Sequence, residues 1–247
     1  MFLYGYFQYI LWMLPAIILS AIAQYMVTSA YNKNSKIKNS KNMTGAEAAR
    51  QVLMNHNITN VAIVPVAGKM TDHFDPRTNT IRLSEGVYNA TTIAAVGIAA
   101  HEAGHAVQHA EGYLPNKFRS FMVPVTNFGS KIGWILIIIG LIMSGYYSYS
   151  ESPKSSETTF DTAGVLLLIG VILYSTSLIF TLITLPVEFN ASKRALTIIK
   201  DRNLLVGEEY NGAKQTLTAA ALTYVAAAIT ALLQLLRVIM MINRRRD

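Results

Sequence analysis

The chain of 247 residues carries a formal net charge of +7, and 52% of its residues are hydrophobic whereas only 14% are charged. A soluble domain has about 25% charged residues, so this deficit predicts a protein that lies in a lipid bilayer. The chain contains no cysteine, which excludes disulfides and Cys-based zinc sites and leaves His, Asp and Glu as possible metal ligands. The basic residues are scattered or flank apolar runs, which is typical of membrane proteins and does not indicate a nucleic-acid partner.

The chain begins with an apolar segment that we expect to be a transmembrane anchor over residues 1–31. It contains no charged residue, and residues 6–31 exceed the roughly 20 residues that a helix needs to cross a bilayer. A cleaved signal peptide would begin with Lys or Arg and would have a shorter apolar core. Lysines follow the segment instead, at positions 33, 36, 38 and 41. Because positive residues favour the cytoplasmic side, we expect the N-terminus outside and the next segment in the cytoplasm.

Residues 32–130 are predicted to form a cytoplasmic region of mixed α and β structure. A helix is expected after Thr44, because Thr44 and Glu47 have the spacing of a capping box. The stretches VAIVPVAG and NTIRLS have the composition of strands, and Asp75 followed by Pro76 marks a turn between them. A further helix is expected to contain the stretch AAHEAGHAVQHAEG.

Two more apolar runs, at residues 132–147 and 163–185, are predicted to form a transmembrane hairpin over residues 131–187. The loop between them, SYSESPKSSETTFD, holds one lysine and three acidic residues. We therefore expect this loop outside and both flanks of the hairpin inside.

The rest of the chain divides into residues 188–215, predicted as a helix and loop, and residues 216–247. The second part contains an Ala-rich, uncharged run at residues 216–236 that is long enough to cross a bilayer. If it crosses, the arginines at 244–246 finish outside, against the positive-inside tendency. The sequence therefore leaves open whether the run is a fourth span or folds against the cytoplasmic region.

The stretch AAHEAGHAVQHAEG holds three of the chain's five histidines. On a helix, His101 and His105 share one face and can reach a single metal ion, while Glu102 can reach a water beside it. This is the H-E-x-x-H arrangement of zinc peptidases. An incidental match on an ordinary helix is the alternative, but it should arise in about 1% or fewer of chains of this length. The motif therefore predicts a metal site with Glu102 as the general base.

His109 shares the face of the other two histidines but does not complete the ligand set. It lies roughly 12 Å along the helix axis from His101, too far for one ion while the helix stays regular. Metzincins solve this with a glycine break and a later histidine, and this chain has Gln108 and Glu111 at those positions. We expect His109 at the rim of the site.

Glu188 is the preferred third ligand, because it opens the face formed by Glu188, Ala191, Ser192 and Ala195 in the stretch LPVEFNASKRAL. The small residues of this face would let its helix approach the H-E-x-x-H helix closely. A charge stabilised at the start of a helix is the alternative interpretation of Glu188. Weaker candidates, which no close-packing face surrounds, are Glu85, Glu208 and Glu209. His56 and His73 are expected at the surface or in turns.

Four stretches together resemble the YugP-type membrane zinc metallopeptidases, a family of neutral zinc peptidases of bacteria. They are DHFDPRTNTIRLSEGVY, IAAVGIAAHEAGHAVQ, LPVEFNASKRAL and LTAAALTYVAAAITALLQLLR. The resemblance implies a multi-pass, gluzincin-type membrane peptidase. It implies one Zn²⁺ ion held by His101, His105 and Glu188, with Glu102 as general base.

One position departs from a more distantly similar group, the HtpX-like enzymes. These usually have an Asp four residues after the ligand Glu, where it supports a metal-bound His. This chain has Ser192 there, so we expect a weaker hydrogen bond to the ligand imidazole.

The predicted fold class is a mainly α integral membrane protein with three to four transmembrane helices and a small α+β zincin-like catalytic domain. The expected function is zinc-dependent hydrolysis of peptide bonds at the cytoplasmic face of a bacterial plasma membrane. The expected partners are the bilayer and a protein or peptide substrate. The sequence indicates neither the substrate nor the oligomeric state.

A hydrogen-bond donor that helps to stabilise the oxyanion is expected, and the sequence offers His73, Tyr88 and Arg194 as candidates. The strand at residues 80–84 could pair with an extended substrate, although a purely structural strand is an equal alternative.

Three other classes of protein compete with this interpretation. A catalytically silent, zinc-stabilised membrane scaffold would need the metal ligands but not Glu102. An intramembrane protease would need a longer apolar run before His101. A transporter or channel would carry charged residues inside its spans, and the first three apolar runs have none.

Overall fold

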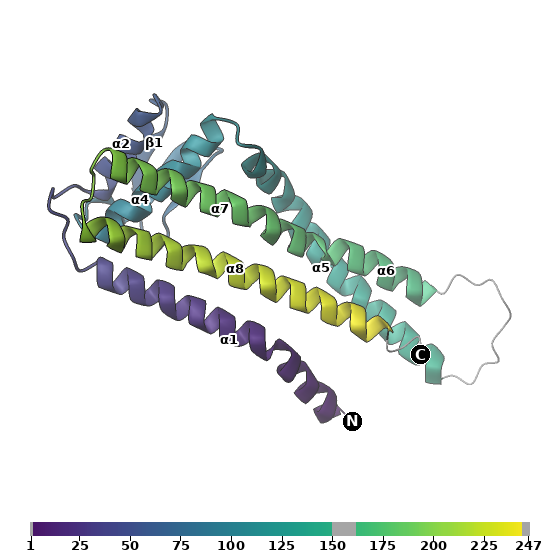
Figure 1. Cartoon of the computed structure of the whole chain (residues 1–247). Helices are drawn as coiled ribbons and strands as arrows, with labels where there is room; N and C mark the ends of the chain where they lie inside the picture. The colour runs from purple at the N-terminus through teal and green to yellow at the C-terminus, as the bar shows by residue number, and fades with distance from the viewer. Residues whose placement is uncertain (1, 150–161, 244–247) are drawn as a thin grey trace. The chain divides into compact units, whose positions relative to one another are not determined.

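The computed structural model describes residues 2–149 and 162–243, and these residues are mainly helical (Figure 1). They divide into two compact units. The site unit comprises Leu19–Lys117 and Thr184–Ala226. The hairpin unit comprises Met1–Ile18, Phe118–Ile183 and Ala227–Asp247.

Helices and a small sheet alternate in the first half of the chain, and only helices follow. The first elements are α1 (Phe2–Asn34), α2 (Gly45–Asn55), β1 (Ala62–Val66), β2 (His73–Asp75), β3 (Thr80–Ser84), α3 (Glu85–Tyr88) and α4 (Ile93–Ala110). The later helices are α5 (Leu114–Tyr149), α6 (Thr162–Tyr174), α7 (Thr176–Asp201) and α8 (Glu208–Asn243). The predicted fold class, a mainly α membrane protein with a small α+β domain, is confirmed.

The predicted capping box begins α2. The Thr44 hydroxyl accepts a hydrogen bond from the Glu47 N–H, and the Glu47 carboxylate accepts one from the Thr44 N–H at 2.8 Å. Hydrogen bonds from the backbone and side chain of Thr44 lower the pKa of the Glu47 carboxyl. The cap fixes where α2 starts, and its Ala, Val and Leu residues then pack into the core of the site unit.

The three strands form one sheet in the order β1-β3-β2, with β1 parallel and β2 antiparallel to β3. The turn between β2 and β3 depends on Asp75, whose carboxylate accepts hydrogen bonds from the Thr78 hydroxyl and the Arg77 N–H. These two bonds lower the pKa of the Asp75 carboxyl. The sequence predicted strands at β1 and β3, whereas β2 has three residues and is too short to show an alternating pattern.

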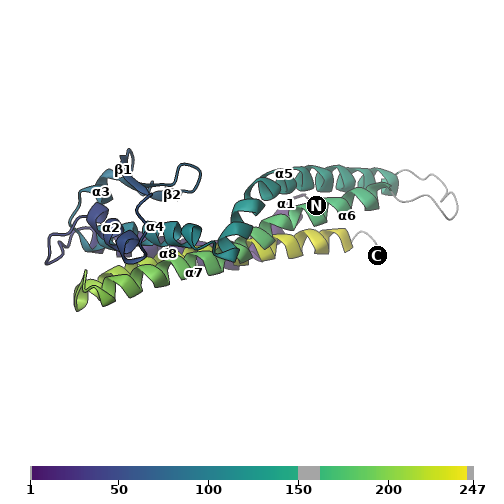
Figure 2. The same cartoon turned by 90° about the horizontal axis from the view of Figure 1, so that it is seen from above.

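Helix α4 lies at the centre of the site unit, between the sheet on one side and helices α7 and α8 on the other (Figure 2). Two glycines of α4 permit this. A Cβ at Gly97 would lie 3.3 Å from the Ala213 Cβ of α8. A Cβ at Gly104 would lie only 2.7 Å from the backbone oxygen of Ala191 in α7. Helices α4 and α7 therefore pack backbone to backbone at this point.

The described residues contain four stretches of helix that are long and apolar enough to cross a membrane. They are Ile10–Asn34, Leu114–Met143, Thr162–Asp201 and Glu208–Asn243. The last of these includes the Ala-rich run of residues 216–236, which thus lies in a helix suited to a fourth span.

Three helix boundaries differ from those expected, and one of them is the start of α8 at Glu208, before residue 216. Helix α5 begins at Leu114, well before the apolar run at residues 132–147, because the polar residues between them do not end a helix. Helix α7 begins at Thr176 and continues through Pro186, so Glu188 lies inside this helix. The alternative interpretation of Glu188 as a charge at a helix start is therefore wrong. Residues 150–161, most of the predicted acidic loop, and the arginines at 244–246 lie outside the described residues.

Candidate metal centre

The H-E-x-x-H motif, residues 101–105, lies within α4, so the motif has the regular helical geometry that the sequence interpretation assumed. The Thr92 hydroxyl caps the helix by accepting a hydrogen bond from the Ala95 N–H at 3.3 Å. One turn apart, the imidazoles of His101 and His105 have ring centroids separated by 4.7 Å and planes inclined by 85°. Both rings therefore point to the same side of α4.

The third member of the group comes from α7. The Oε2 atom of Glu188 lies 3.3 Å from Nε2 of His101 and 3.5 Å from Nε2 of His105. Glu188 is only 2% exposed. The ligand atoms of the three residues lie within 4.8 Å of one another, and this is the one group of its kind found among the described residues. The close approach of α7 to Gly104 is what allows a glutamate side chain to reach both imidazoles.

The Nδ1 atoms of the two imidazoles, which point away from Glu188, lie within hydrogen-bond distance of polar side chains. Nδ1 of His101 lies 3.0 Å from the Ser192 hydroxyl, and Nδ1 of His105 lies 3.0 Å from Oε1 of Gln108. The Nε2 amide of Gln108 donates to the backbone oxygen of Val187 at 2.8 Å and to Oδ1 of Asn190 at 2.9 Å.

These contacts fix the tautomer of His105. The backbone oxygen of Val187 can only accept, so the amide nitrogen of Gln108 faces it and the amide oxygen faces His105. Nδ1 of His105 must then carry a proton and donate it, so in the neutral imidazole, the form that binds metal, the lone pair of Nε2 is directed at Glu188.

The donor set fits a zinc ion. A carboxylate oxygen and an imidazole lone pair that face each other at 3.5 Å are both acceptors, and a positive charge between them stabilises the arrangement. Two His and one Glu form a common three-residue ligand set of catalytic zinc, which leaves a fourth position open. Hydrogen bonds to Nδ1 are the usual way in which proteins orient metal-binding imidazoles.

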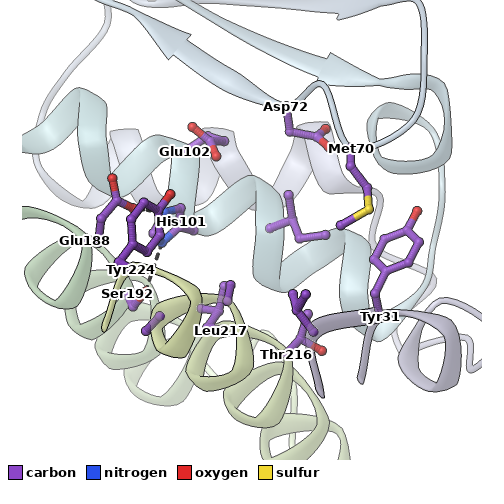
Figure 3. Close-up of a pocket in the computed structure, with 14 residues that line it drawn as sticks. Tyr31, Met70, Asp72, His101, Glu102, Glu188, Ser192, Thr216, Leu217 and Tyr224 are labelled. Carbon is purple, nitrogen blue, oxygen red and sulfur yellow. Dashed lines mark hydrogen bonds and ion pairs between the residues drawn. The ribbon is translucent and has the colours of Figure 1, made fainter. Parts of the chain in front are cut away.

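Glu102 lies beside this group without being part of it. Its Oε2 atom accepts a hydrogen bond of 3.0 Å from the Phe74 N–H of β2, and the residue is 9% exposed. Glu102, His101 and Glu188 line the same cavity (Figure 3). Strand β2 therefore fixes the orientation of the carboxylate at the edge of that cavity.

Ser192 is the one predicted supporting residue that the structure brings to the imidazoles. The exposed side chain of His109 packs against Phe74, with ring centroids 5.7 Å apart, at the end of α4. The exposed His73 places Nδ1 2.7 Å from the Thr71 backbone oxygen. Tyr88 packs against the core beside α2 and α4.

Arg194 and the weaker ligand candidates take part in other contacts. The Arg194 guanidinium pairs with Glu111 at 2.6 Å, and Glu111 also lies 3.3 Å from Nδ1 of His56. Of the weaker glutamates, Glu209 accepts a hydrogen bond from the Ser40 N–H at 2.7 Å. None of these residues belongs to the His–His–Glu group or lines the cavity beside it.

The sequence interpretation missed Gln108 and Asn190. In the sequence, Gln108 stands at the position where metzincins have a glycine, which gives no sign of a supporting role. Its spacing of three residues from His105 places the two on one helix face, and this was the available signal. Asn190 connects Gln108 to Arg194, whose Nε donates to Asn190 Oδ1 at 2.7 Å.

Of the two alternatives left open for β3, pairing with a substrate and a purely structural strand, the structure shows the second. Strand β3 is the middle strand, paired with β1 along Thr80–Ser84 and with β2 along residues 80–82. The last residue of β3, Ser84, lies past the end of the pairing with β2. Its backbone N–H and its hydroxyl both donate hydrogen bonds to the carboxylate of Asp72. Both edges of β3 are therefore occupied within the protein.

The chain is similar to known proteins along nearly its whole length. Residues 9–243 match the family described as "Putative neutral zinc metallopeptidase". Over 234 residues the chain is 41% identical to the protein named "Putative membrane protease YugP" of Bacillus subtilis (strain 168), which covers 95% of this chain and 96% of that protein. No solved structure matches the chain significantly. The residues matched by the family include the whole His–His–Glu group.

Proposed function

This chain belongs to the family described as "Putative neutral zinc metallopeptidase", and we propose that it is a membrane-bound, zinc-dependent endopeptidase. The observation that carries the proposal is the meeting of His101, His105 and Glu188 beside Glu102 in one cavity. A ligand set alone would suit a structural metal. A carboxylate next to the set, held by a backbone N–H and aimed at the same cavity, is what hydrolysis needs in addition.

The roles follow from the positions of the side chains. His101, His105 and Glu188 would hold one Zn²⁺ ion, which supplies a Lewis acid that lowers the pKa of water toward neutrality and polarises the substrate carbonyl. Glu102 accepts the proton of the attacking water and then delivers it to the leaving amine. The hydrogen bond from Phe74 holds one carboxylate oxygen of Glu102 in place, so the general base does not have to reorient before each proton transfer.

We place the active site at the cytoplasmic face of the bacterial plasma membrane. The lysines at 33, 36, 38 and 41 follow the first membrane helix and precede the strands and α4. By the positive-inside tendency, the region that carries the site then lies in the cytoplasm. Cysteine labelling at position 40 in intact cells tests this, because a label that does not cross the membrane should reach Ser40→Cys only after the cells are opened.

The test of the activity compares the purified full-length protein with Glu102→Gln and with a control, Glu85→Gln, which changes an exposed glutamate of α3. The measurements are zinc per protein and the cleavage of casein or of a peptide mixture. We expect wild type and the control to cleave and a chelator to stop both. Glu102→Gln should keep its zinc and lose about 10²–10⁴-fold in rate.

The outcomes separate the proposal from its competitor. Zinc binding by the wild type without any cleavage would assign the chain to the silent scaffold class. Cleavage by Glu102→Gln at the wild-type rate would contradict the role given to Glu102.

A further inference from the structure

A cavity extends from the metal centre into the site unit. It has a volume of about 160 Å³, with His101, Glu102 and Glu188 at one end. Its other walls are contributed by α1, α4, α8 and the loop before β2 (Figure 3). The space is thus continuous with the position of the reacting groups.

One face of α8 forms the longest wall. Leu217, Ala221 and Tyr224 recur at the spacing of a helix face, together with Thr216 and Ala220. From the first to the last of these residues the face runs about 12 Å along the helix axis. This face of α8 is therefore long enough to contact a large side chain along its whole length.

Two polar side chains of the lining, Asp72 and Thr216, are already bonded within the protein. Asp72 accepts hydrogen bonds from the backbone N–H and hydroxyl of Ser84 at 2.7 and 3.0 Å. The Thr216 hydroxyl accepts from Nδ2 of Asn34 at 3.0 Å and donates to a backbone oxygen of α8. Much of the remaining lining is apolar and comes from Val27, Ile98, Leu217 and the alanines of α8.

Buried hydrogen bonds of Asn34 connect two of the walls, α1 and α8. Nδ2 of Asn34, at the end of α1, also donates to the Gly212 backbone oxygen of α8 at 3.1 Å, and Asn34 is 1% exposed. A Cβ at Gly212 would lie 2.7 Å from Oδ1 of Asn34, so the two helices approach closely here. The cavity is therefore preformed, which lowers the entropic cost of filling it.

We propose that this cavity is the specificity pocket of the proposed peptidase and receives one large apolar side chain, such as Leu or Phe, from a residue that flanks the scissile bond. The inference rests on the proposed function and names its substrate class. The volume resembles that of the about 150 Å³ apolar cavity known to bind benzene, so one branched or aromatic side chain fits. The cavity is continuous with Glu102, and this favours a substrate side chain as its occupant. When a side chain fills the cavity, the backbone of the same residue lies next to Glu102 and the metal ligands.

The experiment uses the full-length protein with bound zinc and a set of peptides that differ only in the residues flanking the cleaved bond, each being Ala, Leu, Phe or Asp in turn. We expect kcat/KM on one side of the bond to favour Leu or Phe over Ala and Asp by about tenfold or more. Mass spectrometry of the products identifies that side.

Two variants of the wall test the assignment in opposite directions. Ala221→Leu fills the cavity and should shift the preference from Phe toward Ala, whereas Leu217→Ala enlarges it and should shift the preference from Leu toward Phe. Thr218→Leu is the control, because it introduces the same leucine side chain into α8 at an exposed position that does not line this cavity. The ratio of kcat/KM between peptides is the readout, since a general loss of folding lowers all peptides alike.

The result decides between the pocket and other occupants. If the wild type cleaves but does not discriminate among the flanking residues, the pocket assignment is overturned and the peptidase assignment stands. The same holds if both wall variants slow all peptides equally, as expected for a packing space or for a bound lipid chain. If the wild type binds zinc and cleaves no peptide, the proposed function fails and the pocket assignment falls with it.

Discussion

Replacing Gln108 with Met removes the side chain that connects the metal centre to α7. Gln108 is fully buried and makes three hydrogen bonds, to His105 Nδ1, the Val187 backbone oxygen and Asn190 Oδ1. Met has a similar volume and makes none of them. Loss of the partner of a metal-binding imidazole typically weakens metal affinity by about 10–100-fold, or roughly 1.4–2.8 kcal/mol. Leaving buried polar groups without a partner should in addition lower the free energy of unfolding by about 1–3 kcal/mol.

The assay is zinc competition with a chelator of known affinity, on the full-length protein in detergent, followed by thermal unfolding of the zinc-loaded protein. Gln51→Met, on the exposed face of α2, is the control and should change neither result. Gln108→Glu keeps an oxygen toward Nδ1 of His105 but loses both donors to α7. It should therefore bind zinc more tightly than Gln108→Met while remaining less stable than wild type. Zinc affinity of Gln108→Met within twofold of the wild type would refute the reasoning.

Three further substitutions test the parts of the centre separately. Glu188→Ala should lose zinc on dialysis, with a larger drop in affinity than the about 10–100-fold expected for an outer partner, while Glu208→Ala at an exposed position of α8 should keep it. Ser192→Ala removes the partner of one imidazole and should weaken zinc binding by about tenfold in the same titration, and unchanged affinity would show that this hydroxyl does not orient the ring. Gly104→Ala places a Cβ 2.7 Å from the Ala191 backbone oxygen, so unfolding curves should show a loss of about 1–3 kcal/mol; full stability would mean that α4 and α7 can separate without penalty.

The sequence predicted the part of the site that depends on one helix. His101, Glu102 and His105 follow from helix spacing alone. Glu188 was reached by adding a packing argument, namely that a face of small residues lets two helices approach, and the structure places its carboxylate against both imidazoles.

The features that the sequence did not reveal depend mostly on contacts between distant segments. Strand order is one example, because nothing in the stretch NTIRLS shows that β3 has a neighbour on each side. The contacts of the candidate oxyanion helpers are another, since the sequence does not show that Arg194, on the same helix as Glu188, pairs with Glu111. The start of α5 at Leu114 was missed because apolar composition marks where a helix meets lipid and not where the helix begins.

The position of Glu188 within α7 bears on how the centre is held. A third ligand on a loop could adjust to the ion, whereas Glu188 lies in a continuous helix that runs from Thr176 to Asp201 and contacts α4 backbone to backbone at Gly104. This helix is part of a stretch apolar enough to span a membrane, in which a carboxylate that is 2% exposed is costly without a nearby positive charge. For both reasons, the rigid helix and the buried charge, we expect that binding of a cation and the packing of α4 against α7 stabilise each other.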